Sequence, residues 1–203
     1  MGMESKIICP SCGDVAQAPV VTSVNAVDSP ELKERILSGD LFIWTCPHCG
    51  HRQLRKFPLV YTDPSENILI CLTDQPLAAD DLQGYTGRLV NTVGDLIEKI
   101  KIFDAGLDDV AVELCKYITA QEYGSSASNA SSEGLLNMKF FRLDGSDNEM
   151  IFTYPQDGQM QMLSVGFNVY EDCRGIISRN PAIAEAASGL RKIDRNWLLD
   201  YIA

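Results

Sequence analysis

The stretch "WTCPHCGHRQ", residues 44–53, holds two cysteines separated by a Pro-His dipeptide and followed by glycine. Such a pair suits two chemistries. A thiol oxidoreductase places its Cys-x-x-Cys pair at the N-terminus of a helix, where the helix dipole lowers the pKa of the attacking thiol. A structural metal site uses the same pair as two of the four ligands of a tetrahedral zinc ion. The surrounding sequence has to decide between redox chemistry and metal binding.

A second copy of the motif, "CPSCG", occupies residues 9–13. In both copies glycine follows the second cysteine, where a residue with positive φ closes a tight turn. The segments that follow, 13–24 and 50–61, are typical of strands, and neither pair indicates the start of a helix. Two such turns supply the four thiolates of a closed tetrahedral site. We therefore expect one structural Zn²⁺, with a redox dithiol and free or other-metal thiols as the alternatives. The expected ligands are Cys9, Cys12, Cys46 and Cys49.

Two histidines and three basic residues surround the second pair. His48 and His51 are the only histidines of the chain, and the pattern favours them as neighbours of the metal site over replacements for a thiolate. Arg52, Arg55 and Lys56 are expected to offset the negative charge of a zinc-tetrathiolate centre. The same basic residues leave a nucleic-acid contact open as a competing interpretation.

Composition limits the possible functions. The 203 residues carry a net charge of -11, which repels nucleic-acid phosphates and anionic membranes overall. No apolar run reaches the roughly 18 to 20 residues that span a bilayer, and the N-terminus shows no signal peptide. Seven cysteines in a chain without a secretory signal favour metal binding over disulfides, and the reducing cytoplasm as the compartment.

The segment before the second pair predicts a helix near 30–38. Ser29 is the expected N-cap, Pro30 the first helical residue and Gly39 the end. The expected strands of this region are 6–8, 15–24, 41–45, 51–61 and 67–73.

Helical periodicity returns over residues 92–122, which predict two helices broken at Gly106. Asp108 and Asp109 then belong to the first turn of the second helix, where the helix dipole favours them. After a linker over 123–134, rich in serine and glycine, the chain predicts a three-stranded meander. A helical tail follows, with Asn180 as N-cap, Pro181 as first helical residue and Gly189 as end. Cys71, Cys115 and Cys173 are expected to be small core residues.

The chain resembles the CpXC family, which is named for its repeated Cys-Pro-x-Cys motif. The resemblance rests on the two cysteine pairs, on "SPELKERILSGDLFIWTCPHCGH" and on "FPLVYTDPSENILI", and less specifically on "LIEKIKIFDAGLDDVAVELCK". Tyr61, Asp63 and Pro64 match the family's Tyr-x-Asp-Pro turn. The match covers about residues 5–122. It implies metal binding and supplies no catalytic residues.

Together these observations predict an α+β protein. We expect a β-rich, zinc-ribbon-like N-terminal part, a helical hairpin, and a β-meander with C-terminal helices. The expected divisions are a zinc-binding domain with the helical hairpin over 1–122, a flexible linker over 123–134, and the meander with its helices over 135–203.

The expected function is that of a cytoplasmic, zinc-stabilised interaction or regulatory protein with a protein partner and no membrane association. A nucleic-acid-associated zinc ribbon is one alternative, and a thiol oxidoreductase or other enzyme is another. The sequence contains no Walker loop, no GxGxxG and no GxSxG. Because both histidines belong to the second cysteine motif, a Ser-His-Asp triad elsewhere is excluded. A protein without catalytic residues is therefore favoured.

Overall fold

The computed structural model describes residues 3–75, 79, 82–126, 132–146 and 148–202. The chain divides into two compact units, Met1–Ile97 and Glu98–Ala203. Within the described residues, no helix combines the length and the apolar character needed to cross a membrane.

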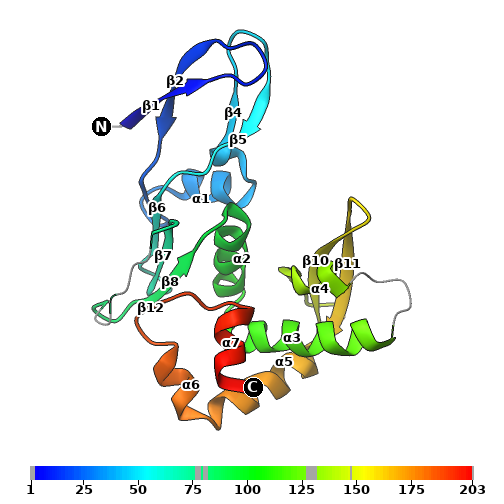
Figure 1. Cartoon of the computed structure of the whole chain (residues 1–203). Helices are drawn as coiled ribbons and strands as arrows, with labels where there is room; N and C mark the ends of the chain where they lie inside the picture. Colours follow the sequence, from blue (N-terminus) through cyan, green and yellow to red (C-terminus); the bar gives the residue numbers. More distant parts are fainter. Residues whose placement is uncertain (1–2, 76–78, 80–81, 127–131, 147, 203) are drawn as a thin grey trace. The chain divides into compact units, whose positions relative to one another are not determined.

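Two short antiparallel hairpins carry the cysteine motifs of the first unit (Figure 1). Strands β1 (Met3–Ile8) and β2 (Val15–Val20) form one hairpin, and β4 (Ile43–Thr45) and β5 (Arg52–Leu54) form the other. The loop at the end of each hairpin is a Cys-Pro-x-Cys-Gly turn.

The segment between the hairpins holds strand β3 (Ser23–Asn25), helix α1 (Pro30–Leu37) and the 3₁₀ turn η1 (Asp40–Phe42). The helix expected near 30–38 is confirmed, with Pro30 in its first turn. Ser29 occupies the N-cap position, but its side chain makes no capping hydrogen bond.

A mixed sheet forms the rest of the first unit, with its strands in the order β8-β7-β6-β3. Strands β6 (Leu59–Asp63) and β7 (Ile68–Leu72) are antiparallel, whereas β3 pairs with β6, and β7 with β8 (Thr86–Val90), in parallel. The strand expected over 51–61 is two strands, β5 and β6, and Pro58 lies in the interruption. Strand β8 was not expected from the sequence, because Gly87 and Arg88 interrupt its apolar pattern.

The second unit begins within helix α2 (Val93–Asp104) and continues with α3 (Asp109–Ser126), so the expected helical hairpin is confirmed. Gly106 separates the two helices with a φ of 68°, a conformation that glycine adopts without strain. Asp108 caps α3 by accepting hydrogen bonds from the N–H groups of Val110 at 2.8 Å and Ala111 at 3.3 Å. The prediction that this acidic pair marks a helix start is therefore confirmed.

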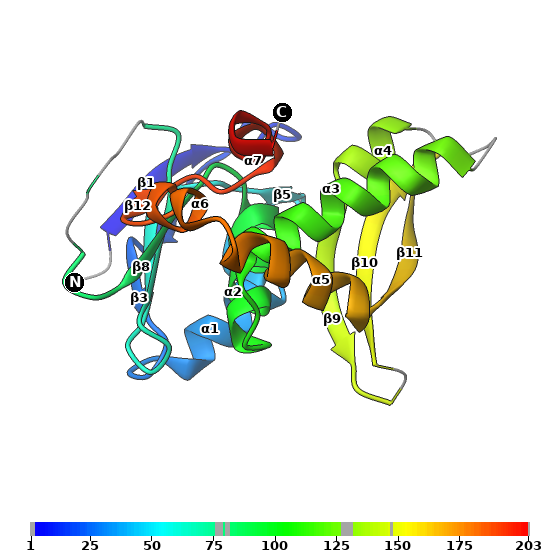
Figure 2. The same ribbon diagram turned by 90° about the horizontal axis from the view of Figure 1, so that it is seen from below.

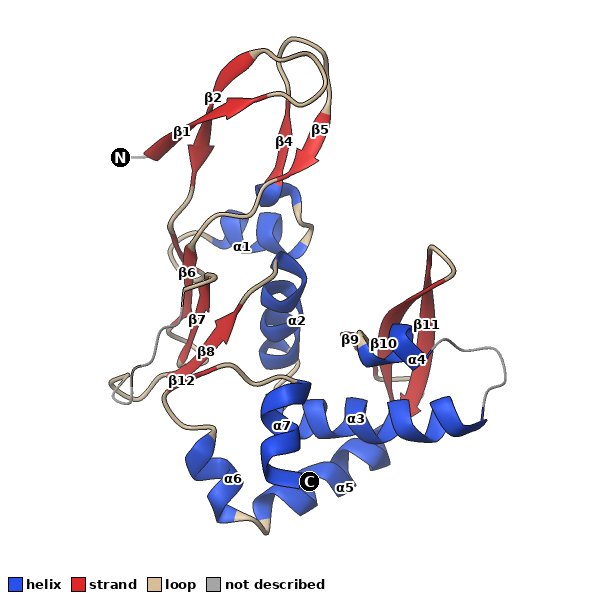
Figure 3. Cartoon of the chain, in the orientation of Figure 1, coloured by secondary structure: helices blue, strands red, loops and turns tan. Residues whose placement is uncertain are grey.

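The meander is also confirmed, with antiparallel strands β9 (Lys139–Asp144), β10 (Glu149–Gln156) and β11 (Gln159–Gly166) in the order β11-β10-β9. Helices accompany it in the second unit (Figure 3). They are α4 (Ser132–Leu136), α5 (Phe167–Ser178), α6 (Pro181–Ala186) and α7 (Arg195–Ile202), and the two-residue strand β12 (Leu190–Arg191) lies between the last two.

Helix α5 was not expected, because its apolar residues include β-branched and aromatic types that also suit strands. Asn180 stands at the N-cap of α6 without a capping side-chain hydrogen bond, and the helix ends at Ala186, before Gly189.

One apolar core holds the second unit together. Helices α3 and α5 run side by side (Figure 2), and the inner face of the meander packs in the same cluster. Phe140 and Phe152 meet edge to face with ring centroids 6.0 Å apart. Cys115 and Cys173 are buried in this core, and Cys71 is buried in the first unit, as expected for small core residues.

Helices occupy both ends of the linker expected over 123–134. Helix α3 continues to Ser126 and α4 begins at Ser132. Adding residues to an existing helix costs little, so serine and glycine can extend α3 despite their low propensity. The remaining part of the linker, residues 127–131, lies outside the described residues. The boundary predicted at residue 122 stays a prediction, whereas the compact units meet between Ile97 and Glu98.

Candidate metal centre

The first cysteine motif forms a tight turn closed by two backbone hydrogen bonds. The N–H of Cys9 donates to the carbonyl of Asp14 at 2.8 Å, and the N–H of Gly13 donates to the carbonyl of Cys9 at 2.9 Å. Gly13 has a φ of 75° and ends the turn in the left-handed region. A residue with a Cβ is strained there, which explains the glycine after the second cysteine.

The second motif repeats this turn. The N–H of Cys46 donates to the carbonyl of His51 at 2.8 Å, and the N–H of Gly50 donates to the carbonyl of Cys46 at 2.9 Å. Gly50 has a φ of 73°. The repeated Cys-Pro-x-Cys-Gly sequence is therefore a repeated structure, and each copy presents two thiols on one side of a turn.

The two turns bring all four sulfurs together, although residues 13–45 separate the pairs in sequence. The Sγ atoms of Cys9 and Cys49 lie 3.6 Å apart, and those of Cys12 and Cys46 lie 3.8 Å apart. All four ligand atoms lie within 4.8 Å of one another. Each short contact joins one turn to the other, so the cluster belongs to both hairpins.

These distances fit metal coordination and exclude a disulfide in this state. Four sulfurs placed tetrahedrally at about 2.3 Å from a zinc ion are about 3.8 Å from one another. A disulfide requires sulfurs about 2.05 Å apart. The 3.6 and 3.8 Å contacts agree with the tetrahedral edge, so the four cysteines can hold one metal ion.

Burial differs within each pair. Cys9 and Cys46 are buried, with 1% and 2% of their surface exposed, whereas Cys12 and Cys49 are exposed. Trp44 packs in the same small cluster and is 8% exposed. The first cysteine of each motif is thus anchored in apolar surroundings, and the second closes the cluster from the solvent side. Ile7, Ala18 and the half-buried Ala16 complete this apolar support.

The protonation of the first motif also suits a metal ligand set. Burial raises the pKa of the Cys9 thiol, but N–H groups of Cys12 and Ser11 outweigh burial and lower that pKa to about 6. The N–H of Asp14 lowers the pKa of Cys12, whereas burial and the adjacent thiols raise it, with a net rise to about 12. Cysteine binds a metal ion as the thiolate, so a metal ion that binds here displaces the proton that Cys12 holds.

Arg55 ties the two hairpins together beside the cluster. Its guanidinium donates to Ser5 Oγ at 2.6 Å and to the carbonyl of Pro19 at 3.4 Å, and its backbone N–H donates to the carbonyl of Phe42 at 2.7 Å. Burial lowers the pKa of Arg55. The sequence did not reveal this bridge, because its partners are a hydroxyl and a carbonyl far away in the chain.

Arg55 and Lys56 were expected to offset the charge of the metal centre, but the contacts observed for them are with other groups. Arg55 binds the β1–β2 hairpin, and Lys56 binds Asp74 at 2.5 Å and the carbonyl of Asn91 at 3.1 Å. His48 is exposed and His51 is half-buried, and the four-residue metal cluster found among the described residues contains no histidine.

Neither cysteine pair opens a helix. Strand β2 follows the first turn, and β5 follows the second. The helix dipole that lowers a thiol pKa in thioredoxin-type sites therefore has no counterpart at these pairs.

The Tyr-x-Asp-Pro turn after the second hairpin is a separate polar cluster. Asp63 is 4% exposed, and its carboxylate accepts hydrogen bonds from Ser65 N at 3.2 Å, Lys33 Nζ at 3.3 Å and Tyr61 Oη at 3.4 Å. Burial raises the pKa of Asp63, but the contacts with Ser65 and Lys33 outweigh it and lower that pKa. Asp63 joins α1 to the turn between β6 and β7, a structural role that the sequence pattern did not disclose.

Two β-hairpins that each present a Cys-Pro-x-Cys-Gly turn to a shared four-sulfur cluster define a class of four-cysteine, ribbon-like proteins whose cluster could hold a metal ion. The chain belongs to the CpXC family, since the family described as CpXC protein matches residues 7–116, more than half of the chain. The resemblance inferred from the sequence is therefore confirmed. Comparison with curated proteins finds no match, and neither does comparison with solved structures.

Proposed function

We propose that this protein is a zinc-stabilised interaction or regulatory protein of the cytoplasm, with Cys9, Cys12, Cys46 and Cys49 as the ligands of one structural Zn²⁺. The observation that carries the proposal is the four-sulfur cluster, with edges of 3.6 and 3.8 Å between the two turns. Four thiolates complete a tetrahedral shell, which leaves no coordination position for substrate or water. The proposal is therefore structural zinc, not catalytic zinc.

Native mass spectrometry with elemental analysis tests the metal. We expect one zinc per chain after gentle purification, and loss of zinc in Cys46→Ser because three thiolates bind it more weakly. Cys71→Ala is the matched control, since Cys71 is buried outside the cluster and should leave the zinc content unchanged. A wild-type chain without metal, or a Cys46→Ser chain that keeps it fully, would contradict the proposal.

A protein partner is supported by apolar side chains beside the first turn. Ile8 and Val15 flank the turn, face each other across the β1–β2 ladder, and are 66% and 50% exposed. An exposed cross-strand apolar pair suits contact with another apolar protein surface better than contact with phosphate. The chain's net charge of -11 likewise disfavours nucleic acid.

A pulldown from native lysate, with and without nuclease, tests the kind of partner. We expect a protein that stays bound after nuclease treatment and is lost from Ile8→Glu but retained by Val27→Glu. Val27 is 59% exposed and lies between β3 and α1, outside the hairpin. Recovery of RNA or DNA, with nuclease releasing the bound material, would favour the nucleic-acid alternative instead.

The oxidoreductase alternative predicts a measurable activity. If the Cys46–Cys49 pair were catalytic, the protein would reduce insulin disulfides with turnover of a small thiol. We expect none above background, because zinc-bound thiolates are weak nucleophiles and neither pair lies at a helix N-terminus. Turnover by the zinc-loaded protein that is lost in Cys49→Ser would overturn the proposal.

A further inference from the structure

The three-stranded meander of the second unit has two edge strands, β9 and β11. An edge strand presents N–H and C=O groups that can pair with another chain. Natural proteins protect such edges with charged side chains, prolines, bulges or a covering element. The two edges of this sheet differ in this protection.

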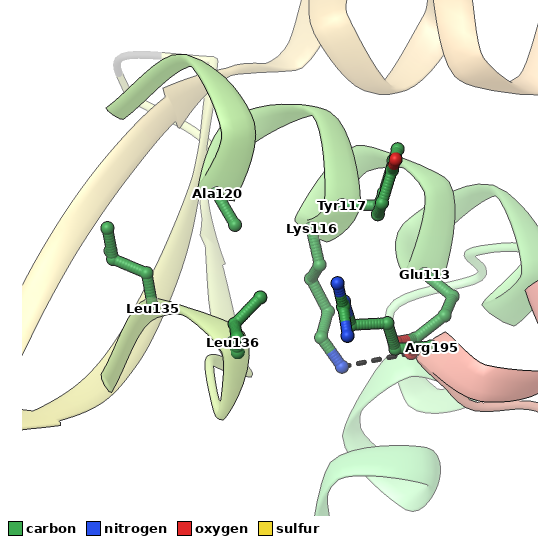
Figure 4. A pocket seen from close by; sticks show the side chains of 7 residues that line it. All are labelled: Glu113, Lys116, Tyr117, Ala120, Leu135, Leu136 and Arg195. Carbon is green, nitrogen blue, oxygen red and sulfur yellow. Dashed lines mark hydrogen bonds and ion pairs between the residues drawn. The ribbon is translucent and has the colours of Figure 1, made fainter. Parts of the chain in front are cut away.

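Charged groups close the β9 edge. Glu98 of α2 accepts hydrogen bonds from the N–H of Phe140 at 2.8 Å and from Lys139 Nζ at 3.1 Å. Lys116 binds Glu98 at 3.0 Å and Glu113 at 2.9 Å (Figure 4). A bulge in the pairing of β9 with β10 adds to this protection. The β9 edge is therefore covered by groups of its own unit.

Strand β11 carries none of these devices. Its sequence, QMQMLSVG, contains no charged residue and no proline. It pairs with β10 on one side, and no strand in the described part of the chain pairs with its other side. Met160 and Met162 are 63% and 64% exposed. A long, uncharged edge with large exposed apolar side chains suits contact with another chain.

The turn before β11 identifies the backbone groups that are open. Asp157 and Gly158 have φ values of 51° and 74°, as in a two-residue type I′ hairpin turn. Gln156 and Gln159 flank this turn and form a hydrogen-bonded pair, and bonded and non-bonded pairs alternate along the ladder from there. Every second residue of β11 thus turns its N–H and C=O away from β10. These residues are Met160, Met162 and Ser164.

Charge favours a second copy of this chain as the partner of β11. Two chains that each carry a net charge of -11 repel one another overall. An antiparallel pairing of β11 with itself brings no charged side chain from either strand into the contact. A partner of opposite charge would find no ionic contact on this strand.

One register of two antiparallel β11 strands brings their open groups together. With Met162 opposite its own copy, Met160 lies opposite Ser164, so the open N–H and C=O groups face one another. The same register places Asp157 of each copy level with Phe167, the first residue of α5, in the other copy. Helix α5 has no acidic residue in its first turn, and its dipole attracts a carboxylate there.

We propose that the protein forms a symmetric dimer in which two β11 strands pair antiparallel, with Met162 at the two-fold axis. The two meanders become one continuous sheet, and Met160 and Met162 of both copies lie together on its outer face. The contact is one strand wide, smaller than the roughly 800 Å² per partner of a standard interface, so we expect a dissociation constant in the micromolar range. This contact is separate from the four-cysteine cluster and goes beyond the proposed function.

Sedimentation velocity of the full-length, zinc-loaded protein across the micromolar range tests the dimer. We expect a reversible monomer–dimer equilibrium for the wild type. Met162→Lys and Met162→Glu should each be monomeric, because like charges would meet at the axis. An equimolar mixture of the two variants should dimerise again, because opposite charges then meet. Ile176→Lys, which changes an exposed apolar residue of α5, should dimerise as the wild type does.

Amide hydrogen exchange followed by nuclear magnetic resonance tests the backbone pairing. The N–H groups of Met160 and Ser164 should exchange at least tenfold faster in monomeric Met162→Lys than in the wild-type dimer. Those of Leu163 and Val165 bind β10 in both proteins, so their equal exchange reports that the meander keeps its fold.

Asp157→Asn tests the register, because asparagine suits the same turn but carries no charge. Loss of the carboxylate at the start of α5 should weaken the dimer roughly threefold or more. A dimer as tight as the wild type would overturn the register with Met162 at the axis.

Three results would overturn the dimer itself. They are a wild-type chain that stays monomeric across the micromolar range, a dimer that persists in Met162→Lys, and a mixture of the two Met162 variants that stays monomeric. A monomeric wild type whose Met160 N–H becomes protected only after lysate is added would assign the β11 edge to a different protein.

Discussion

At the scale of single residues, the contacts of Asp63 explain why the family motif contains an aspartate. The aspartate of the Tyr-x-Asp-Pro turn binds the serine that follows it, the tyrosine before it, and Lys33 on α1. Four hydrogen bonds, including one from the Ser65 hydroxyl, meet one buried carboxylate. This residue joins the helix of the inserted segment to the sheet.

Replacing Asp63 with asparagine should destabilise the protein by about 2 kcal/mol at neutral pH, because charge-assisted hydrogen bonds are lost. The folded state lowers the pKa of Asp63. Its stabilisation is therefore fully present above the unfolded pKa of about 3.9 and is lost as pH falls through the folded pKa. Urea unfolding at pH 7 and near pH 3 checks this, and the gap between wild type and variant should shrink in acid.

Asp74→Asn serves as the control for this measurement. Asp74 pairs with Lys56, but its side chain is 67% exposed, so its loss should cost less than about 1 kcal/mol. An Asp63→Asn protein as stable as Asp74→Asn at pH 7 would contradict the role given to Asp63.

At the scale of elements, a buried ion pair fixes the junction of α2 and α3. Lys99 Nζ lies 2.6 Å from Asp109 Oδ2, and the two side chains are 5% and 2% exposed. Lys99 is on α2, and Asp109 is in the first turn of α3, on the other side of the turn at Gly106. A charge buried this deeply is tolerated because its partner is in direct contact.

Asp109→Asn should destabilise the protein by about 3 to 5 kcal/mol, because Lys99 would remain buried without its counter-charge. The double variant Lys99→Met/Asp109→Leu should lose less than the sum of the two single changes. Chemical denaturation of the three variants forms the cycle, with the more exposed pair Lys192–Asp194 as a control expected to contribute under about 1 kcal/mol. Strict additivity at Lys99 and Asp109 would show that the pair is not coupled.

At the scale of the whole molecule, the two compact units depend on different cores. Near the cysteine turns, the first unit has a small apolar cluster of only a few residues, which includes Trp44. The second has a large core from α3, the meander and α5. If zinc closes the four-cysteine cluster, the β1–β2 and β4–β5 hairpins depend on the metal, whereas the meander does not.

Removal of the metal should therefore act locally. Structural zinc contributes on the order of 10 kcal/mol in small zinc modules. We expect a chelator, or the change Cys46→Ser, to speed hydrogen exchange in residues 3–20 and 43–54 and to leave residues 139–166 nearly unchanged. Hydrogen-exchange mass spectrometry checks this, with Cys71→Ala as the variant that should behave like the wild type. Hydrogen exchange that speeds up equally throughout the chain would contradict the prediction that only the two hairpins depend on the metal.

The sequence by itself determined the features that follow from local chemistry. Duplicated motifs with glycine at their ends predicted two equivalent cysteine turns, because only glycine enters the positive-φ position without strain. Apolar periodicity and Gly106 predicted the helical hairpin, and alternation between turns predicted the meander. These signals involve neighbours a few residues apart, so they can be read along the chain.

Only the tertiary structure decided the contacts between distant segments. The cross-turn contact of Cys9 with Cys49, the Arg55 bridge to Ser5, and the Asp63 link to Lys33 each join residues at least 30 positions apart. The same holds for the β9 edge, since Glu98 reaches the N–H of Phe140 only once α2 lies beside the meander. Burial and hydrogen-bond satisfaction depend on which distant side chains surround a group in three dimensions, and a linear pattern does not contain that information.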